Sequence, residues 1–294
     1  MSTVAVVAHR KKTFDGGLDE LRSVLVHEGV EPLWYEVPKS KKAPGAARKA
    51  VEEGADLVFV WGGDGTVQRC VDELVDDEVP IAILPAGTAN LLANNLGVPL
   101  TLPEAVRCGL HGRRRRLDVG TINGEHFMVM AGAGLDALMI RDADRGLKDK
   151  AGRLAYVWTG LRHVRSSKVQ MEVKVDGDAW FDGEASCVLV ANVGTIVGGL
   201  SPFERAEPDD GVLELGVVEA EGALEWARVV GRMAIGKVEG SPLTRTTSAR
   251  KITVRASRKV AYELDGGDRG KARKIKIRIR PGAVRICVPA GAEG

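Results

Sequence analysis

Two short loops in this sequence combine glycine with side chains that can hold a phosphate group or a reacting hydroxyl. The first loop, Gly62-Gly63-Asp64-Gly65-Thr66, follows an apolar run that ends at Trp61. Glycine lets backbone N–H groups approach phosphate oxygens, and a helix N-terminus favours anions. Asp64 repels a bare phosphate, so a ligand here requires a cation or a reacting hydroxyl beside it. The alternative is a tight turn in which Asp64 only hydrogen-bonds its own loop.

The second loop lies in Ile83-Leu-Pro-Ala-Gly-Thr-Ala-Asn90. Pro85 fixes the exit from a strand, Gly87 permits close backbone approach, and Thr88 can cap a helix or bond a phosphate. Asn90 can donate and accept hydrogen bonds within the loop. Each feature also fits an ordinary helix start. Two such loops at the ends of neighbouring parallel strands form a crevice where open α/β sheets bind ligands, so together they predict nucleotide binding.

The first part of the chain alternates strand and helix patterns. Apolar runs predict strands, and helical apolar spacing predicts the segments between them. Alternation of this kind predicts a parallel sheet with helices on its faces, forming an α/β nucleotide-binding domain over residues 1–118. The expected strands are Thr3–Ala8, Leu33–Val37, Asp56–Trp61 and Ile81–Leu84, and the expected helices are Leu18–Glu28, Ala46–Glu53, Val67–Val75 and Ala89–Leu96.

After about Asp118, strand patterns dominate. We expect a second, mostly antiparallel β domain over residues 119–294, carrying the lipid or acceptor and metal site. The domain boundary is expected near Arg113–Asp118, with a cleft between the two domains, and the last strand can return to the first domain. Helices are expected near Leu154–Arg165 and Leu224–Lys237. The expected strands are Glu125–Ala131, Lys168–Val175, Ser186–Val193, Val212–Val218, Lys251–Ala256, Val260–Leu264, Lys274–Arg280 and Val284–Val288.

Composition limits the class of protein. The 294 residues are 44% hydrophobic and 28% charged, which is typical of a globular protein. No apolar run reaches the roughly 18–20 residues of a membrane span, no signal peptide is evident, and the four cysteines are scattered. These features predict a cytoplasmic protein with reduced thiols, which leaves peripheral association with the inner face of a membrane open.

The charge is unevenly distributed, although the formal net charge is only +2. Between Arg245 and Arg285 there are 14 Lys/Arg against 3 Asp/Glu, a local net of +11, which predicts an anionic partner. The absence of aromatic residues between Arg269 and Gly294 argues against nucleic acid. Residues Lys274–Arg280 alternate strictly between cationic and apolar. Such a strand fits either an outer strand protected from edge pairing or a face attracted to an anionic membrane.

The order of motifs along the chain resembles the diacylglycerol kinase catalytic-domain family, which includes bacterial lipid kinases and the sphingosine and ceramide kinases. G-G-D-G-T alone is also found in NAD kinases, but here P-A-G-T-A-N follows it. The resemblance continues through R-L-D-V-G-T-I-N-G, A-G-A-G-L-D-A, V-A-N-V, A-E-P-D-D-G-V-L and E-L-D-G-G, which begin at Arg116, Ala131, Val190, Ala206 and Glu263.

The resemblance implies ATP-dependent phosphorylation of a lipid hydroxyl at a membrane surface, with Asp64 acting through the metal or the hydroxyl. It also implies a structural Mg²⁺ held by Asp210, the carbonyl of Val212, and Glu207; oxygen ligands suit this ion. A turn between strands is the alternative for this Asp-Gly segment. The residues expected to bind ATP are Arg10, Lys11, Lys12, Gly62, Gly63, Asp64, Gly65, Thr66, Gly87, Thr88 and Asn90.

The chain departs from the family pattern at several places, two of which carry expected site residues. The family's D-G-E, whose acid removes the acceptor's proton, is Asp265-Gly266-Gly267-Asp268 here. Asp265 is the expected catalytic base; Asp268 taking the role, a weak or inactive kinase, and an Asp-Gly-Gly hairpin turn are the alternatives. The family's first phosphate loop is replaced by Ala8-His9-Arg10-Lys11-Lys12, whose cations either meet phosphate or form a solvated loop.

Three functions therefore stay open from the sequence. The first is a lipid kinase with a diacylglycerol-like or sphingoid acceptor. The second is a NAD kinase-like enzyme that phosphorylates a ribose hydroxyl. The third is a catalytically weak regulator that binds nucleotide or lipid. The sequence leaves the oligomeric state open, with a homodimer as one arrangement.

Overall fold

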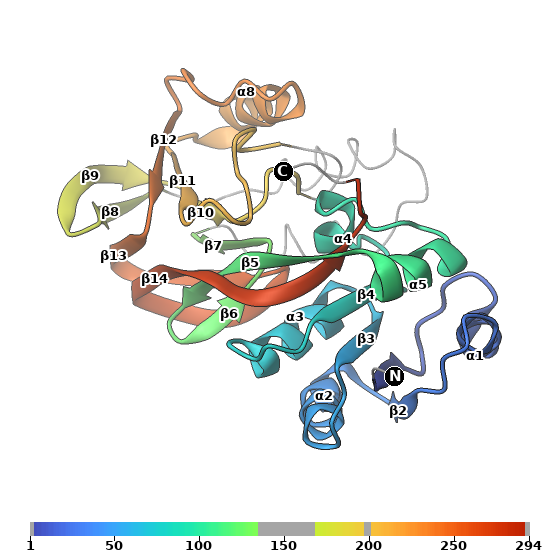
Figure 1. The fold of residues 1–294 in the computed structure, drawn as a ribbon. Helices are drawn as coiled ribbons and strands as arrows, with labels where there is room; N and C mark the ends of the chain where they lie inside the picture. Colours follow the sequence, from blue (N-terminus) through green and yellow to red (C-terminus); the bar gives the residue numbers. More distant parts are fainter. Residues whose placement is uncertain (1–2, 135–167, 197–200, 292–294) are drawn as a thin grey trace. The chain divides into compact units, whose positions relative to one another are not determined.

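The computed structural model describes residues 3–134, 168–196 and 201–291 (Figure 1). Contacts within the chain divide it into two compact units. Unit 1 comprises Met1–Leu117 and Gly282–Gly294, and unit 2 comprises Asp118–Pro281. The helix expected near Leu154–Arg165 lies outside the described residues.

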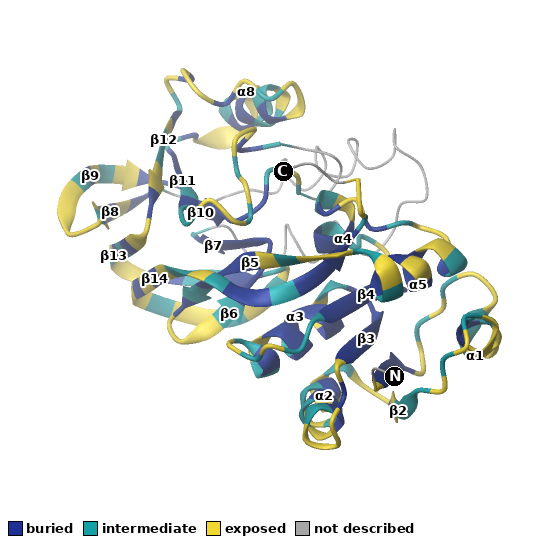
Figure 2. Cartoon of the chain, viewed as in Figure 1, coloured by how far each residue is buried: buried dark blue, intermediate teal, exposed yellow. Residues whose placement is uncertain are grey.

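Four parallel strands form the sheet of unit 1. They lie in the order β2–β1–β3–β4, with bounds β1 Val4–His9, β2 Leu33–Val37, β3 Leu57–Gly62 and β4 Ile81–Pro85. Every residue of β1, β3 and β4 is buried, as expected for strands covered on both faces (Figure 2). The predicted parallel α/β architecture of this part of the chain is confirmed.

The helices of unit 1 pack on the two faces of this sheet (Figure 1). On one face, Leu25 and Val106 from two helices join Val6, Phe59 and Trp61 of the sheet in one hydrophobic core. The second pair of helices, which pack against each other, covers the opposite face. The first pair is α1 Gly17–His27 with α5 Leu102–His111, the second is α2 Ala43–Glu52 with α3 Asp64–Leu74, and the short elements are η1 Ser40–Lys42 and α4 Leu91–Asn95.

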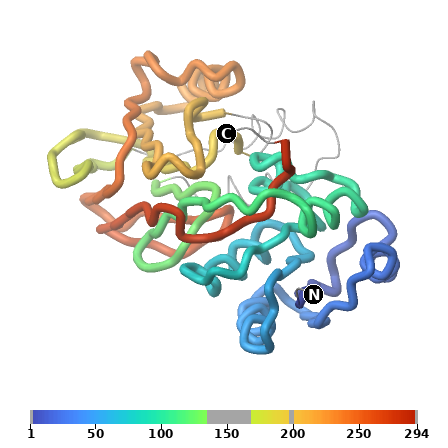
Figure 3. Tube along the Cα trace, in the orientation of Figure 1, coloured from blue at the N-terminus to red at the C-terminus, as the bar shows by residue number. Residues whose placement is uncertain are grey.

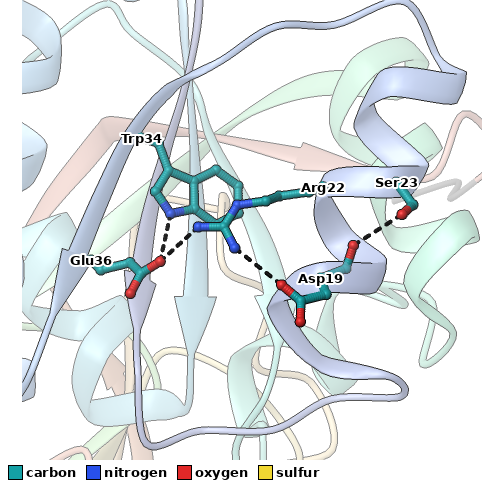
Figure 4. Close-up of polar contacts among 5 residues, drawn as sticks. All are labelled: Asp19, Arg22, Ser23, Trp34 and Glu36. Atoms are coloured by element: carbon teal, nitrogen blue, oxygen red, sulfur yellow. Dashed lines mark hydrogen bonds and ion pairs between the residues drawn. The ribbon is translucent and has the colours of Figure 1, made fainter.

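A set of polar contacts attaches α1 to the outer strand β2 (Figure 4). The Arg22 guanidinium stacks on the Trp34 ring with its carbon 4.2 Å from the ring centroid, and it donates to Glu36 at 2.8 Å and to Asp19 at 3.2 Å. The Trp34 indole N–H also donates to Glu36, at 2.9 Å. Because both donors bond the charged form, they hold the pKa of Glu36 below its ordinary value, with the tryptophan as the larger cause.

The C-terminal strand, β14 Gly267–Val288, ends in unit 1. Its last residues, red in Figure 3, pair in parallel with β4 through Ile286 and Ile81. Strand β5, Arg113–Ile122, begins in unit 1 with its arginines and continues into unit 2. Arg116 makes a bidentate ion pair with Glu78, at 2.9 and 3.0 Å.

Unit 2 is built from antiparallel strands, which confirms the second part of the predicted fold class. The order β12–β11–β10–β7–β13–β14 forms the main path, β8 pairs with β13 and β9, and β5 pairs with β6 and β14. The bounds are β6 Glu125–Phe127, β7 Met130–Ala133, β8 Val169–Val175, β9 Asp178–Ala185, β10 Cys187–Ala191, β11 Leu213–Val218, β12 Thr244–Ala249, β13 Lys251–Leu264 and α8 Gly222–Ala234.

Several element boundaries differ from the sequence-based expectation. The two strands expected at 251–256 and 260–264 form the single strand β13, whose pairing with β14 shifts register between 255 and 263. The two strands expected at 274–280 and 284–288 are likewise both part of β14. The strand expected at 125–131 divides into β6 and β7. Helix α5 and strands β5, β9 and β12 were not expected. Among the described helices, none combines the length and the hydropathy needed to cross a bilayer.

Candidate functional site

The loops that follow the parallel strands of unit 1 lie at one edge of its sheet. The register places His9 beside Val37, Ala8 beside Trp61, and Gly62 beside Pro85, so the carboxyl ends of all four strands are level. The chain goes from β1 to β2 on one side and then to β3 on the other. The loops after β1 and β3 therefore flank a topological switch point, the position at which open α/β sheets bind ligands.

Gly63 and Gly87 bring the two predicted loops into backbone contact. A β-carbon on Gly87 would lie 2.5 Å from the Gly63 α-carbon, and one on Gly63 would lie 3.0 Å from the Gly87 α-carbon. A β-carbon on Gly62 would lie 2.5 Å from the β-carbon of Thr66. By contrast, Gly65 has open space around it and is exposed. Three of these glycines thus allow the loops to pack, and Gly65 is the one with room for a ligand.

Asp64 occupies the first turn of α3, which begins three residues earlier than predicted. A carboxylate is favourable there because of the positive end of the helix dipole. Its Oδ1 also accepts a long hydrogen bond, 3.4 Å, from the backbone N–H of Leu92 at the start of α4. The side chain is half-buried. The acidic residue is therefore accommodated by the fold itself and still faces partly outward at the sheet edge.

Asn90 fixes the second loop. It adopts a left-handed conformation, with φ 46°, accepts a hydrogen bond from the N–H of Gly87 at 2.8 Å, and donates to the carbonyls of Pro85 and Gly87 at 2.9 and 3.0 Å. The prediction that Asn90 donates and accepts within its loop is confirmed. Its side chain shapes the loop, while Thr88 is exposed beside it. Contact of either residue with a nucleotide stays a prediction.

Thr66 lies beneath the first loop. It is 1% exposed, and its hydroxyl shares a hydrogen bond of 2.9 Å with the hydroxyl of Ser40, in η1 after β2. Ser40 was not among the predicted residues; its only sequence signal is a serine among lysines after a strand. The bond links the segment after β2 to the loop after β3, so the buried Thr66 side chain stabilises both at the carboxyl edge of the sheet.

The basic loop after β1 has a fixed backbone and outward cations. The Nδ1 atom of His9 accepts the N–H of Lys11 at 3.2 Å, and the Trp61 indole donates to the carbonyl of Lys12 at 3.1 Å. Burial, and then the charges of Lys12 and Lys11, lower the pKa of His9, which keeps the imidazole neutral as an acceptor. Arg10 and Lys11 are exposed at the edge of the sheet.

In unit 2, Asp265 begins a two-residue hairpin turn between β13 and β14 and has φ 44°. Its carboxylate accepts the backbone N–H groups of Met128, Val129 and Met130, at 2.9, 2.9 and 3.0 Å. Its own N–H donates to the carbonyl of Met130 at 2.8 Å. Both carboxylate oxygens are therefore engaged in holding the segment that enters β7.

The same arrangement recurs in two other turns of the fold. Asn123, with φ 50°, donates its N–H to Lys276 and accepts that residue's N–H on its side chain, at 2.9 and 3.0 Å. Asp176, with φ 52°, does the same with Lys251, at 2.8 and 2.7 Å. This recurrence shows a structural task for Asp265; its role as the catalytic base stays a prediction.

Glu263 is a buried acid that the motif comparison did not select. It is 3% exposed, lies between Gly132 and Asp268 in the sheet, and its Oε1 has no hydrogen-bond partner. Burial is the main cause that raises its pKa to about 7, and the charges of Asp265 and Asp268 raise it further, against Arg269. In the sequence, the one indication of this site was that Glu263 is an acidic residue between Tyr262 and Leu264 in a predicted strand.

The predicted magnesium ligands lie in the turn before β11. Asp210 accepts the N–H of Val212 at 2.9 Å, and Gly211 donates to the buried Asp118 at 2.6 Å, which ties the turn to β5. Burial raises the pKa of Asp210, and the negative charges of Glu207 and Asp209 raise it further. The described residues contain no cluster of three or more His, Cys, Asp or Glu suited to a metal. A divalent cation would offset the negative charges around Asp210, and the binding of Mg²⁺ there stays a prediction.

The fold and the two loops define a class of protein: an α/β unit with two glycine-containing loops at the switch point of its parallel sheet, followed by an antiparallel β unit. Models of two known domain families match the chain, the diacylglycerol kinase catalytic domain over residues 6–122 and the YegS C-terminal NAD kinase beta sandwich-like domain over residues 129–288. The chain therefore belongs to the diacylglycerol kinase catalytic-domain family.

Curated relatives agree with this membership, and solved structures share the fold. The chain is 28% identical over 264 residues to "Diacylglycerol kinase" of Bacillus subtilis, covering 87% of this chain and 86% of the relative. It is 30% identical over 256 residues to "Probable lipid kinase YegS-like" of Pseudomonas fluorescens, covering 83% of each. A diacylglycerol kinase structure from Bacillus anthracis has a TM-score of 0.78 at 22% identity, covering 98% of this chain and 97% of that one. An NAD kinase from Archaeoglobus fulgidus in complex with ATP has a TM-score of 0.53 at 14% identity, covering 97% and 93%.

Proposed function

We propose that this protein is a lipid kinase that transfers the γ-phosphoryl group of ATP to a diacylglycerol-like or sphingoid hydroxyl. The observation that carries the proposal is the contact between Gly63 and Gly87, which joins two polar loops at the switch point of a parallel sheet. Family membership and relatives named as diacylglycerol and lipid kinases support the acceptor class.

The chain's own residues have separate tasks in this proposal. The N-terminus of α3, with the open position at Gly65, would receive phosphate oxygens, and the outward cations Arg10 and Lys11 would neutralise them. ATP supplies the phosphoryl group, and Mg²⁺ offsets its charge. Asp64 would orient the metal or the acceptor hydroxyl at the same edge.

A structural Mg²⁺ would bind in the turn before β11. Asp210, with Glu207 and the carbonyl of Val212, supplies oxygen donors of the kind that this ion prefers. Asp265 would accept the proton of the acceptor hydroxyl, and its bonds to backbone N–H groups hold the turn, as those of Asp176 do in the β8–β9 hairpin.

One experiment separates the lipid kinase from its alternatives. Purified protein is incubated with γ-labelled ATP and Mg²⁺, and with diacylglycerol or sphingosine in mixed micelles, or with NAD. Label in phosphatidic acid or a sphingoid phosphate is the expected result. Label only in NADP would replace the proposal with NAD kinase activity, to which the shared fold gives some support. Calorimetric binding of ATP without turnover of any alcohol would favour a nucleotide- or lipid-binding regulator.

A further inference from the structure

One face of the β8–β13–β14 sheet in unit 2 is crowded with cations. Alternate residues of the three strands lie on this face, because the register places Lys251 opposite Arg278, Arg255 opposite Lys274, and Thr253 between Lys276 and Lys174. The side chains surround a cavity of about 230 Å³. We call this surface the basic face; its six cations are Lys174, Lys251, Arg255, Lys274, Lys276 and Arg278.

The other side of the same strands is the core of unit 2. Val173, Val254, Ile275 and Ile277 alternate with the cations and are buried at 0–3% exposure. The cations are exposed, so the three strands are amphipathic across their full width (Figure 2). The fold therefore presents the charge as one continuous surface rather than as scattered side chains.

Protection of an outer strand does not explain this charge. Strand β14 pairs with β13 on one side and with β5 on the other. Asn123 of the β5–β6 turn receives the N–H of Lys276 and donates its own N–H to that residue's carbonyl. Lys276 and Arg278 consequently lie where β14 has a neighbour on each side and edge pairing needs no deterrent.

The arrangement costs stability in the free protein. Like charges directly opposite each other on neighbouring strands are destabilising, and both the Lys251–Arg278 and the Arg255–Lys274 positions are of this kind. Glu172, opposite Arg255, is the one carboxylate among the residues that line the cavity. Within residues 3–134, 168–196 and 201–291, none of the six cations makes an ion pair. A surface of this kind is complementary to a dense array of negative charge.

We propose that the basic face docks unit 2 on a membrane surface of anionic phospholipids, whose headgroups enter the cavity. A membrane fits better than nucleic acid because no aromatic side chain lines the cavity to stack on bases. A cluster of cations without ion-pair partners is also what attraction to a charged bilayer uses. The inference goes beyond the proposed kinase activity and does not depend on it.

Vesicle co-sedimentation without ATP or Mg²⁺ tests the proposal independently of catalysis. The probes are vesicles of phosphatidylcholine alone and vesicles that also contain phosphatidylglycerol. Binding is expected only to the anionic vesicles and should weaken as salt is raised, because the Debye length falls from about 10 Å at 0.1 M to about 3 Å at 1 M. Equal binding to both vesicles, or binding to neither, would overturn the proposal.

A charge-matched pair of variants locates the surface. Lys251→Gln/Arg255→Gln/Lys276→Gln should weaken binding on the order of 100-fold, since each basic residue near an anionic surface contributes about fivefold. The control variant, which carries glutamine at three exposed cations of unit 2 outside the basic face, should bind as the wild type does; these are Arg205, Arg228 and Lys237.

Three results would count against the basic face. Equal losses in both triple variants would mean that net charge alone drives binding. An unchanged affinity in the first variant, with its circular dichroism spectrum intact, would place the contact elsewhere. If the wild type bound RNA but no vesicles, and the first variant lost the RNA binding, the basic face would be a nucleic-acid surface instead.

Discussion

Replacing Glu263 by glutamine removes a carboxyl group that unit 2 buries with one oxygen lacking a hydrogen-bond partner. In the folded protein its pKa is raised from 4.5 to about 7, mainly by burial. Folding therefore favours the protonated form, and unfolding releases a proton at pH values between these two. The stability that protonation supports is present below about pH 4.5 and is lost as the pH rises to about 7.

The size of this effect follows from the shift. A shift of about 2.5 pH units, at about 1.36 kcal/mol for each unit, gives a loss of roughly 3 kcal/mol across that window. Glutamine cannot ionise, so Glu263→Gln should escape the loss. Relative to the wild type, the variant should gain about 3 kcal/mol between pH 4.5 and pH 8.

The assay is urea denaturation followed by circular dichroism from pH 4.5 to pH 8, for the wild type and for the variant. Glu184→Gln, at an exposed position on β9, controls for the loss of one negative charge. Parallel stability curves for the wild type and Glu263→Gln would refute the reasoning. The same would follow if the control variant reproduced the gain.

Three further predictions concern the turns and loops. Asp265→Asn should lower the melting temperature more than Asp176→Asn, because the Asp265 carboxylate accepts three backbone N–H groups. The expected loss in the free energy of unfolding is about 1–3 kcal/mol. A fall in turnover at an unchanged melting temperature would instead support a role as catalytic base. Gly87→Ala should destabilise unit 1 by roughly 1 kcal/mol or more, because the new methyl group would lie 2.5 Å from the Gly63 α-carbon. Gly65→Ala should keep the melting temperature of the wild type, because Gly65 has open space around it. Equal melting temperatures for the two variants would contradict the close approach of the loops. Gly267→Glu, which restores the family's acid, should fold, because its β-carbon meets mainly the end of a flexible arginine side chain, and should raise phosphoryl transfer; unchanged transfer in the folded variant would show that this position is not limiting.

Much of unit 1 was predictable because β1, β3 and β4 are short, fully buried apolar runs. Buried parallel strands carry that signal in the local sequence, and the carboxyl-edge loops follow from it. Helix α5 was missed although Pro103 in its first turn and Thr101 before it are helix-start signals. Strand β12, Thr-Arg-Thr-Thr-Ser-Ala, was missed because its polar residues form a strand only through pairing with β11.

The tasks of the site residues were harder to predict. Gly87 was expected to make room for phosphate, yet its nearest neighbour is Gly63, from a loop more than twenty residues away. The contacts of Asp265 reach the 128–130 segment, which no local pattern indicates. The burial of Glu263 depends on pairing with Gly132, so its raised pKa also arises from a long-range contact. Local sequence therefore located the loops, and tertiary contacts decided what their side chains do.

The most direct test of the proposed function is phosphoryl transfer from labelled ATP to diacylglycerol by the wild type and by Asp64→Asn. Asp72→Asn, on the exposed side of the same helix α3, is the matched control. We expect labelled phosphatidic acid from the wild type and the control, and none from Asp64→Asn, with all three proteins melting at similar temperatures. Near-normal transfer by Asp64→Asn, or no transfer to any lipid alcohol by the wild type, would contradict the account.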